Sequence, residues 1–376
     1  MTEFFNTPYL GDYFQYIVLY LIAWALILCA RGVIYDNKIV SVNQMLGLMA
    51  LVIVVILMGM RPSNSAYGDT INYTWGFNKY AQNKDAIHFR WEKEWLFENT
   101  TRFFAKYSNL HAFFTTCAIV YVGALWLALR RIFDEYNFVP LLIVMSMFTF
   151  WAYGVNGMRN GMGASMFILA MTYTNNIPLM LALAFVGVGF HNSVYIMFAA
   201  AALAWVLNNS RLYMLIWGIC IAVSFAIGST IQAWMAGFAG SIDEGNKLTS
   251  YLTYSHSAMV ADGFVASTSF RWDFIAYSGL GVAIGAYFIL RRRFEDEYYR
   301  WIFNTYLLCN SFWILIIRAP YSNRFAQISW FILPIVLIYP FMRERFWVNQ
   351  EKMLGLAIVL FYAFNFLTNT IPALMR

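Results

Sequence analysis

Apolar stretches alternate with short polar stretches along almost the whole chain. A helix that crosses a bilayer needs about 20 mostly apolar residues, and twelve segments come near this requirement. They are residues 13–30, 43–60, 111–129, 137–153, 162–175, 177–190, 193–207, 212–228, 273–290, 300–317, 325–341 and 353–371. The three between residues 162 and 207 are short and closely joined, so we expect a different count or broken, re-entrant helices there. The pattern predicts an all-α, polytopic membrane bundle of about twelve transmembrane helices, with residues 1–376 forming a single transmembrane domain.

The composition excludes a water-soluble globular protein. Hydrophobic residues make up 61% of the chain and charged residues 12%, whereas a soluble domain carries about 25% charged residues. The stretch from Met1 to Asp12 has no Lys or Arg, so it lacks the basic start of a cleaved signal peptide, and we expect the first apolar segment to be retained. The four cysteines lie within apolar segments, where we expect small hydrophobic side chains rather than disulfides or zinc ligands.

The basic residues predict an orientation in the membrane. Short runs of them follow the first, third, seventh, ninth and eleventh apolar segments, and short loops rich in Lys and Arg stay in the cytoplasm. They include Arg31 and Lys38, Arg130 and Arg131, Arg211, Arg291 to Arg293 with Arg300, and Arg343, Arg345 and Lys352. Both termini and the longer loops, at about 61–110 and 229–271, then face outward, with an amphipathic surface helix expected over 94–109. This distribution accounts for the pI near 9.0 without nucleic acid as a partner.

Five arginines remain on the outward side, where orientation alone would not place them. They are Arg61, Arg159, Arg271, Arg318 and Arg324. Arginine near bilayer depth is costly unless it is paired or faces water, and its planar guanidinium bonds two phosphate oxygens at once. We expect these residues to bind the diphosphate of a lipid-linked substrate at the outer leaflet. The alternative is snorkelling to lipid headgroups or pairing with internal carboxylates.

Two other polar residues are candidates for acid–base chemistry. His191 ends a short apolar segment and could act as a base or bind diphosphate, although a satisfied interfacial histidine is the simpler interpretation. Asp69 follows Arg61 by eight residues and could orient it or accept a proton, or it could cap a turn. The outward loops contain no Asp-x-Asp pair, so we expect neither a metal nor another cofactor.

Two further patterns have a structural and a functional interpretation. Gly157, Gly161 and Gly163 surround Arg159; they could allow close helix packing or let a substrate headgroup approach the backbone. The aromatic residues between positions 73 and 97 include Tyr73, Trp75 and Trp91. Their rings could stack on sugars, or they could form the aromatic belt of a membrane interface. We expect these three to bind sugar.

The order of these motifs resembles that of the EpsG-like branch of Wzy-type polysaccharide polymerases. The resemblance extends from about Gly59 to Pro334. Its motifs are Gly59-Met60-Arg61 followed by Asp69 and Tyr73, then Arg159 with Gly161, Gly163 and Ala164, then Phe190-His191-Asn192-Ser193, and finally Tyr321-Ser322-Asn323-Arg324.

The resemblance implies a reaction and a location. A glycan on undecaprenyl diphosphate would move onto a lipid-linked oligosaccharide repeat unit at the outward face of a bacterial cytoplasmic membrane, in a GT-C-like bundle that needs no nucleotide sugar. A chain-length regulator would be a further partner. Arg159 and Arg324 would stabilise the leaving diphosphate, with Arg61, Arg271, Arg318 and Tyr321 as further contacts, and His191 or Asp69 would be the base. The rival functions are an O-antigen ligase, another GT-C transferase using polyprenyl phosphate, a lipid-linked sugar flippase and an outer-leaflet acyltransferase.

Overall fold

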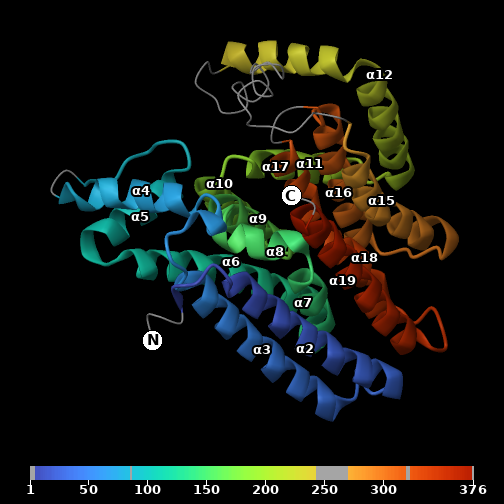
Figure 1. The fold of residues 1–376 in the computed structure, drawn as a ribbon. Coiled ribbons are helices and arrows are strands. Elements are labelled where there is room, and N and C mark those ends of the chain that lie inside the picture. Colours follow the sequence, from blue (N-terminus) through green and yellow to red (C-terminus); the bar gives the residue numbers. More distant parts are fainter. Residues whose placement is uncertain (1–4, 85–86, 243–269, 319–321, 375–376) are drawn as a thin grey trace. The chain divides into compact units, whose positions relative to one another are not determined.

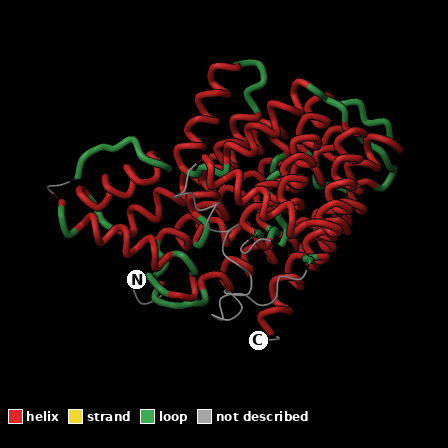
Figure 2. The backbone as a smooth tube through the Cα atoms, turned by 90° about the horizontal axis from the view of Figure 1, so that it is seen from above, coloured by secondary structure: helices red, strands yellow, loops and turns green. Residues whose placement is uncertain are grey.

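The computed structural model describes residues 5–84, 87–242, 270–318 and 322–374. These residues form helices and connecting loops, with no strand among them (Figure 2). The prediction of an all-α membrane protein is therefore confirmed. By contacts the chain divides into two compact units, Met1–Tyr195 with Phe341–Arg376 and Ile196–Pro340, and the single transmembrane domain stays a prediction.

The first unit consists of the N-terminal half and the last helix (Figure 1). Its helices are α2 (Leu10–Arg31), α3 (Asn37–Gly59), η1 (Ser65–Tyr67), α4 (Thr70–Ala81), α5 (Trp95–Tyr107), α6 (Leu110–Phe133), η3 (Asp134–Tyr136), α7 (Phe138–Met145), α8 (Phe148–Val155), α9 (Met158–Met171), α10 (Ile177–Phe190) and α19 (Gln350–Leu374). The amphipathic helix expected over 94–109 is α5. In sequence, α11 (Val194–Val206) leads into the second unit and α18 (Leu333–Arg343) leads out of it.

Helix α9 is the central helix of the first unit. It packs against α6 on one side and α10 on another, and every residue along it is buried except Arg159 and Met166. Glycine makes this packing possible, because a Cβ on Gly163 would lie 2.9 Å from the carbonyl oxygen of Gly187 in α10. A Cβ on Gly161 would lie 2.8 Å from the carbonyl oxygen of Tyr153. These contacts favour the helix-packing interpretation of the two glycines.

The second unit is formed around a buried helix and a polar network. Its helices are α12 (Ser210–Ile242), α15 (Trp272–Ala286), η4 (Tyr287–Arg291), α16 (Glu297–Leu315) and α17 (Asn323–Trp330), with most of α11 and α18. The side chain of Asn310 in α16 donates to Ser278 Oγ and Ser329 Oγ, each at 2.9 Å, and accepts from Trp217 Nε1 at 2.8 Å. These bonds link α12, α15 and α17 to α16. Buried amides in a membrane bundle need such partners, because lipid offers none.

All twelve apolar segments coincide with helices, but they are not all long enough to cross a bilayer. Among the described residues, seven helices are long and apolar enough, or eight if the bent pair α7 and α8 counts as one span. The three segments between residues 162 and 207 form α9, α10 and α11, which have 14, 14 and 13 residues. At 1.5 Å per residue each extends only about 20 Å. The sequence had predicted a different span count or broken helices in this region, and the helices there are indeed too short to span a bilayer.

The bend between α7 and α8 measures 74°. Ser146 Oγ donates to the carbonyl oxygen of Leu142, an arrangement that weakens the helix at this point. The main-chain amide of Phe148, which has lost its helical partner, donates to Oδ1 of the buried Asn365 in α19 at 3.2 Å. The sequence had predicted one span over residues 137–153; the structure divides it into two helices, and α8 leads into the start of α9.

Candidate functional site

Arg159 lies at the start of α9 and contacts two carboxylates of α5. Its Nη1 atom lies 2.6 Å from Oε2 of Glu94 and 3.5 Å from Oε1 of Glu98. The guanidinium also lies over the ring of Phe97, at 4.5 Å from the centroid, and over that of Tyr73, at 5.5 Å. The Arg159 side chain is 27% exposed, and its Nε and Nη2 atoms make no hydrogen bond to the part of the chain that the structure describes. Arg159 is thus held by one edge, while the other edge can bond to an anion.

Glu94 occupies an unusual backbone position at the start of α5. Its φ of 56° and ψ of 40° are left-handed, a conformation that is uncommon for a residue other than glycine. The helix is fixed near this point by Asn99, whose amide donates to the carbonyl oxygens of Arg90 and Trp95 at 2.8 and 2.7 Å. Arg102, one turn further on, pairs with Glu92 at 2.9 Å. The Glu94 carboxylate is 13% exposed and is therefore mostly enclosed.

His191 lies on the other side of Glu94, between α10 and α11. Its Nε2 atom is 3.5 Å from Oε1 of Glu94. Its Nδ1 atom accepts from the main-chain amide of Ser193 at 3.0 Å and lies 2.7 Å from Ser193 Oγ. Ser193 Oγ in turn donates to Oδ1 of Asn160 in α9 at 2.9 Å. The amide contact calls for a lone pair on Nδ1, whereas the contact with Ser193 Oγ, whose proton goes to Asn160, calls for a proton there, so the hydrogen bonds fix the ring position and not its tautomer.

The segment with Asp69 and Tyr73 is joined to the turn before α9 through Asn156. The main-chain amide of Asp69 donates to Asn156 Oδ1 at 2.8 Å, and the hydroxyl of Tyr73 donates to the Asn156 carbonyl oxygen at 3.1 Å. Gly68 allows this approach with a φ of +57°, and a Cβ there would lie 2.5 Å from Asn156 Oδ1. Asp69 directly precedes α4 at the N-cap position, but its side chain makes no capping hydrogen bond to the main chain, so the structure does not support the capping interpretation; its Oδ1 accepts from Asn72 Nδ2 at 3.1 Å.

Arg61 is completely buried beneath this turn. Its Nε donates to Thr70 Oγ1 at 3.0 Å, its Nη1 donates to the carbonyl oxygen of Met58, and its Nη2 contacts the carbonyl oxygen of Val155 and the Met158 sulfur. Burial lowers the pKa of Arg61 to about 10, which still leaves it protonated at neutral pH. These contacts show Arg61 joining α3, α4, α8 and α9. They do not support a direct contact with diphosphate, which remains an untested prediction.

The aromatic candidates divide into two places. Tyr73 belongs to the Arg159 cluster, where its ring lies 5.6 Å from that of Phe97. Trp91 is 69% exposed and packs against Trp95 and Phe89, with ring centroids 4.6 and 5.2 Å away. Trp75 is 68% exposed and lies near Lys79. Such exposed rings suit a membrane interface and a sugar alike, so both interpretations remain open for Trp75 and Trp91.

The remaining arginines belong to the second unit. Arg271 forms a two-point ion pair with Asp273, at 2.9 Å from Nε and 2.6 Å from Nη2. Arg318 donates to the carbonyl oxygen of Phe225 at 3.4 Å and lies over the ring of Phe270. Arg324 begins α17 and is exposed. Tyr321 lies outside the described residues.

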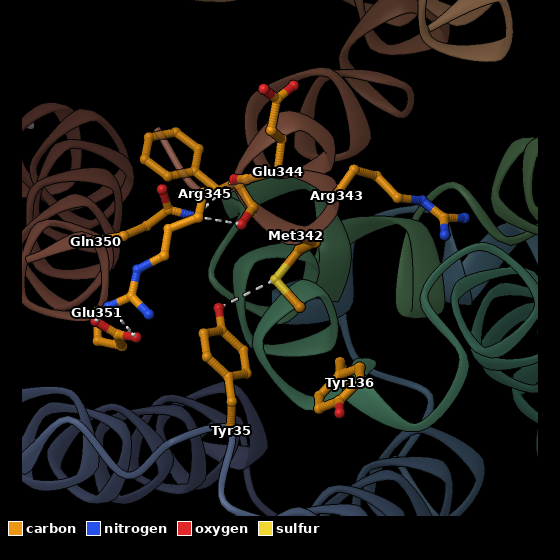
Figure 3. A pocket seen from close by; sticks show the side chains of 9 residues that line it. Tyr35, Tyr136, Met342, Arg343, Glu344, Arg345, Gln350 and Glu351 are labelled. Carbon is orange, nitrogen blue, oxygen red and sulfur yellow. Dashed lines mark hydrogen bonds and ion pairs between the residues drawn. The ribbon is translucent and has the colours of Figure 1, made fainter. Parts of the chain in front are cut away.

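A pocket of about 230 Å³ lies at the other end of the first unit (Figure 3). Its lining comes from the loops after α2, α6 and α18, which the sequence predicted to be cytoplasmic. Arg345 is directed toward Glu351, at 3.3 Å, and the hydroxyl of Tyr35 toward the sulfur of Met342, at 3.4 Å. Arg343 donates to the carbonyl oxygen of Ile132 at 2.6 Å. Three basic loops that are far apart in the sequence therefore meet at one end.

The sequence had not indicated Glu94 and Glu98 as site residues. They belong to a segment interpreted as a surface helix, and their contact with Arg159 depends on how the chain folds back. One signal was present: the two acidic residues are four positions apart, so they share one face of a helix. No three His, Cys, Asp or Glu side chains within the described ranges are grouped so as to hold a metal ion.

A sequence model of the EpsG family matches residues 44–374, nearly the whole chain. The chain belongs to the EpsG family. This is the exopolysaccharide and O-antigen polymerase-like family, so the resemblance found in the sequence motifs is confirmed, and the chain is a polysaccharide polymerase-like, multi-pass membrane protein. Searches of curated proteins and of solved structures found no match. The GT-C-like architecture of this EpsG-family chain thus remains a prediction.

Proposed function

We propose that this EpsG-family protein is a Wzy-type polymerase. It transfers a glycan from undecaprenyl diphosphate onto a lipid-linked oligosaccharide repeat unit, with inversion and without a metal, at the outward face of a bacterial cytoplasmic membrane. The observation that carries the proposal is the meeting of Arg159, His191 and Tyr73 around two carboxylates at the start of a buried helix. Ionisable side chains that cluster in a membrane protein are by default candidates for a functional site.

The outward placement is supported by the two ends of α3 and α6. Helix α3 has 23 residues, which correspond to about 34 Å, enough to span the hydrocarbon core. Arg61 follows one end of it, and Tyr35 of the basic-loop pocket precedes the other. Helix α6 runs back beside it, since His111 lies near Gly59 and Gln44 donates to the carbonyl oxygen of Glu135. If the basic loops are cytoplasmic, the Arg159 cluster faces outward.

In the proposed reaction the acceptor hydroxyl attacks the anomeric carbon as the diphosphate leaves from the opposite face. Diphosphate is already a good leaving group, so the main demand on the protein is to stabilise the charge that develops on it. A preorganised donor in this role contributes about 3–4 kcal/mol. Arg159 can donate from Nε and Nη2 while Nη1 is held by Glu94. Arg324, Arg271, Arg318 and Tyr321 remain proposed diphosphate contacts.

The test uses a host that lacks its own polymerase, with the sugar chain length read on a gel. Arg159→Ala and Arg324→Ala should leave single repeat units on the lipid core while protein levels hold. Near-normal ladders from both variants would contradict the roles assigned to these arginines. Purified protein given only the lipid-linked repeat unit should make polymer without an energy source. Addition of a single sugar would indicate another GT-C transferase, and translocation without product would indicate a flippase.

A further inference from the structure

We propose that Glu94 is the catalytic base of this transferase: its carboxylate accepts the proton of the acceptor hydroxyl. This inference rests on the proposed polymerase function and assigns a step within it. Glu94 is a strong candidate because it is at the centre of the cluster. One of its oxygens contacts Arg159 and the other faces His191. Both carboxylate oxygens are therefore held in place before substrate binds.

Two contacts hold the carboxylate from two sides. Arg159 and His191 each approach a different oxygen of it. Arg159 places a positive charge 2.6 Å from Oε2 of Glu94. Glu98 also contacts Arg159, at 3.5 Å, and accepts from the hydroxyl of Tyr80 at 3.2 Å. Glu98 therefore serves as a positioning residue.

His191 is poorly arranged to be the base itself. Its Nδ1 atom is occupied by the main-chain amide and the hydroxyl of Ser193. Its Nε2 atom faces the Glu94 carboxylate at 3.5 Å rather than an open space. Ser193 and Asn160 fix the ring through their own hydrogen bond. His191 is thus a positioning residue for Glu94.

Asp69 has a different structural task. It directly precedes α4, its amide is bonded to Asn156, and its carboxylate accepts from Asn72 in the first turn of that helix. These bonds place Tyr73 beside Arg159. We therefore assign Asp69 to the positioning of the α4 segment.

The step balances as a single displacement. The oxygen of the acceptor hydroxyl forms a bond to the anomeric carbon while the bond from that carbon to the diphosphate oxygen breaks. The bonding pair leaves with undecaprenyl diphosphate, and the hydroxyl proton moves to Glu94. In this step Nη1 of Arg159 stays with the carboxylate, while its Nε and Nη2 would bond to the leaving diphosphate. Glu94 afterwards returns the proton to water.

The experiment measures initial elongation rates of the purified full-length protein, with lipid-linked repeat unit as the only substrate, from about pH 4.5 to pH 8. Four proteins are compared: the wild type, Glu94→Gln, Glu94→Asp and Glu92→Gln. Glu92 is the matched control, because it lies two residues before Glu94 and pairs with Arg102 and Arg90 outside the cluster. Thermal melting in detergent reports whether each variant is folded.

Loss of a general base lowers a rate by about 10²–10⁴-fold. We expect Glu94→Gln to lose activity in this range, and its residual rate should no longer fall at acidic pH. Glu94→Asp should regain part of the rate, and its rate should again fall at acidic pH. The rate of Glu92→Gln should stay close to that of the wild type at neutral pH, because Glu92 pairs with Arg90 and Arg102 and not with Arg159 or His191. Glu98→Gln removes the other carboxylate partner of Arg159. The elongation rate of this variant should still decrease at acidic pH.

Two results would overturn the proposal. A Glu94→Gln protein that keeps more than about a tenth of the wild-type rate, with the same pH profile, excludes Glu94 as the base but leaves the polymerase function intact. A wild-type protein that forms no polymer rejects the polymerase function and the base with it. If Glu94→Gln does not fold, the test uses Glu94→Asp. A folded Glu94→Asp protein whose elongation rate does not decrease at acidic pH contradicts a carboxylate base at this position.

Discussion

The Nη1 atom of Arg159 lies 2.6 Å from Oε2 of Glu94, although 65 residues separate the two in the sequence. The pair joins the start of the buried helix α9 to the start of the amphipathic helix α5. It also decides how Arg159 can act. A guanidinium that is held by one edge keeps a fixed orientation, and its other donors are then preorganised for an anionic oxygen.

Arg159→Lys should therefore be a strong change even though it keeps the charge. An ammonium group is a compact point charge and cannot hold Glu94 along one edge while bonding an anion along another. We expect the elongation rate to fall by about 10²-fold, with only a small change in melting temperature. The measurement is the initial rate from purified protein and lipid-linked repeat unit. A lysine variant with nearly wild-type rates would show that charge alone is sufficient at this position.

Gly68→Ala should destabilise the protein and reduce its activity. The φ of +57° at this position and the approach of Asn156 leave no room for a Cβ. Backbone strain of this kind costs about 1–3 kcal/mol, and movement of Asn156 would release Asp69 and Tyr73. Melting temperature and elongation rate should both decrease.

Gly76→Ala is the matched control for this change. A Cβ at Gly76 would meet nothing within 4 Å, and alanine in the interior of α4 is favoured over glycine by about 1 kcal/mol. The control should be neutral or stabilising. Equal loss in both variants would contradict the specific role of Gly68.

Asn310→Leu should lower the stability of the second unit. The change removes the acceptor of Trp217 Nε1 and the donors to Ser278 and Ser329, and a buried polar group that loses its partner costs about 1–3 kcal/mol. Its neighbour Cys309 is equally buried, and Cys309→Ala tests loss of packing alone. Melting curves in detergent should show the larger decrease for Asn310→Leu. The reverse order would mean that packing, not hydrogen bonding, dominates at this level of α16.

The pair of Glu92 and Arg102 should make part of the stability depend on pH. The hydrogen bond from Arg102 lowers the pKa of Glu92. The pair therefore stabilises the folded state fully above the ordinary glutamate pKa, and this contribution is lost as the pH falls through the lowered pKa of the folded state. Melting temperatures of the wild type and Glu92→Gln should differ at about pH 6 and converge at about pH 3. A difference that is constant with pH would contradict this role.

Much of the fold could be predicted from the sequence because it depends on local patterns. Each of the twelve apolar segments is helical, and the irregular region between residues 162 and 207 was placed correctly. The bend after Met145 could not be predicted. At the bend the amide of Phe148 donates to the side chain of Asn365, which lies 217 positions later in the chain. A local sequence pattern cannot predict such a contact.

The site was predicted only in part for the same reason. Arg159, His191 and Tyr73 were identified from motifs, and the structure brings all three to one cluster. Glu94 was missed because its importance comes from its neighbours in space. Arg61 had the features of a ligand-binding arginine in the sequence, and the structure shows it completely buried; its contact with diphosphate stays a prediction.

The burial of Arg61 also has a consequence for biogenesis. Besides the carbonyl oxygen of Met58, its partners are Thr70, Val155 and Met158, and its guanidinium lies 4.0 Å from the ring centroid of Phe114; these four residues lie later in the chain. They are therefore synthesised after Arg61 itself. When α3 first enters the membrane, the ribosome has not yet produced the segments that enclose this cation. The N-terminal spans therefore cannot reach their final packing until translation has passed residue 158. The final packing of α2 and α3 thus follows the synthesis of the start of α9.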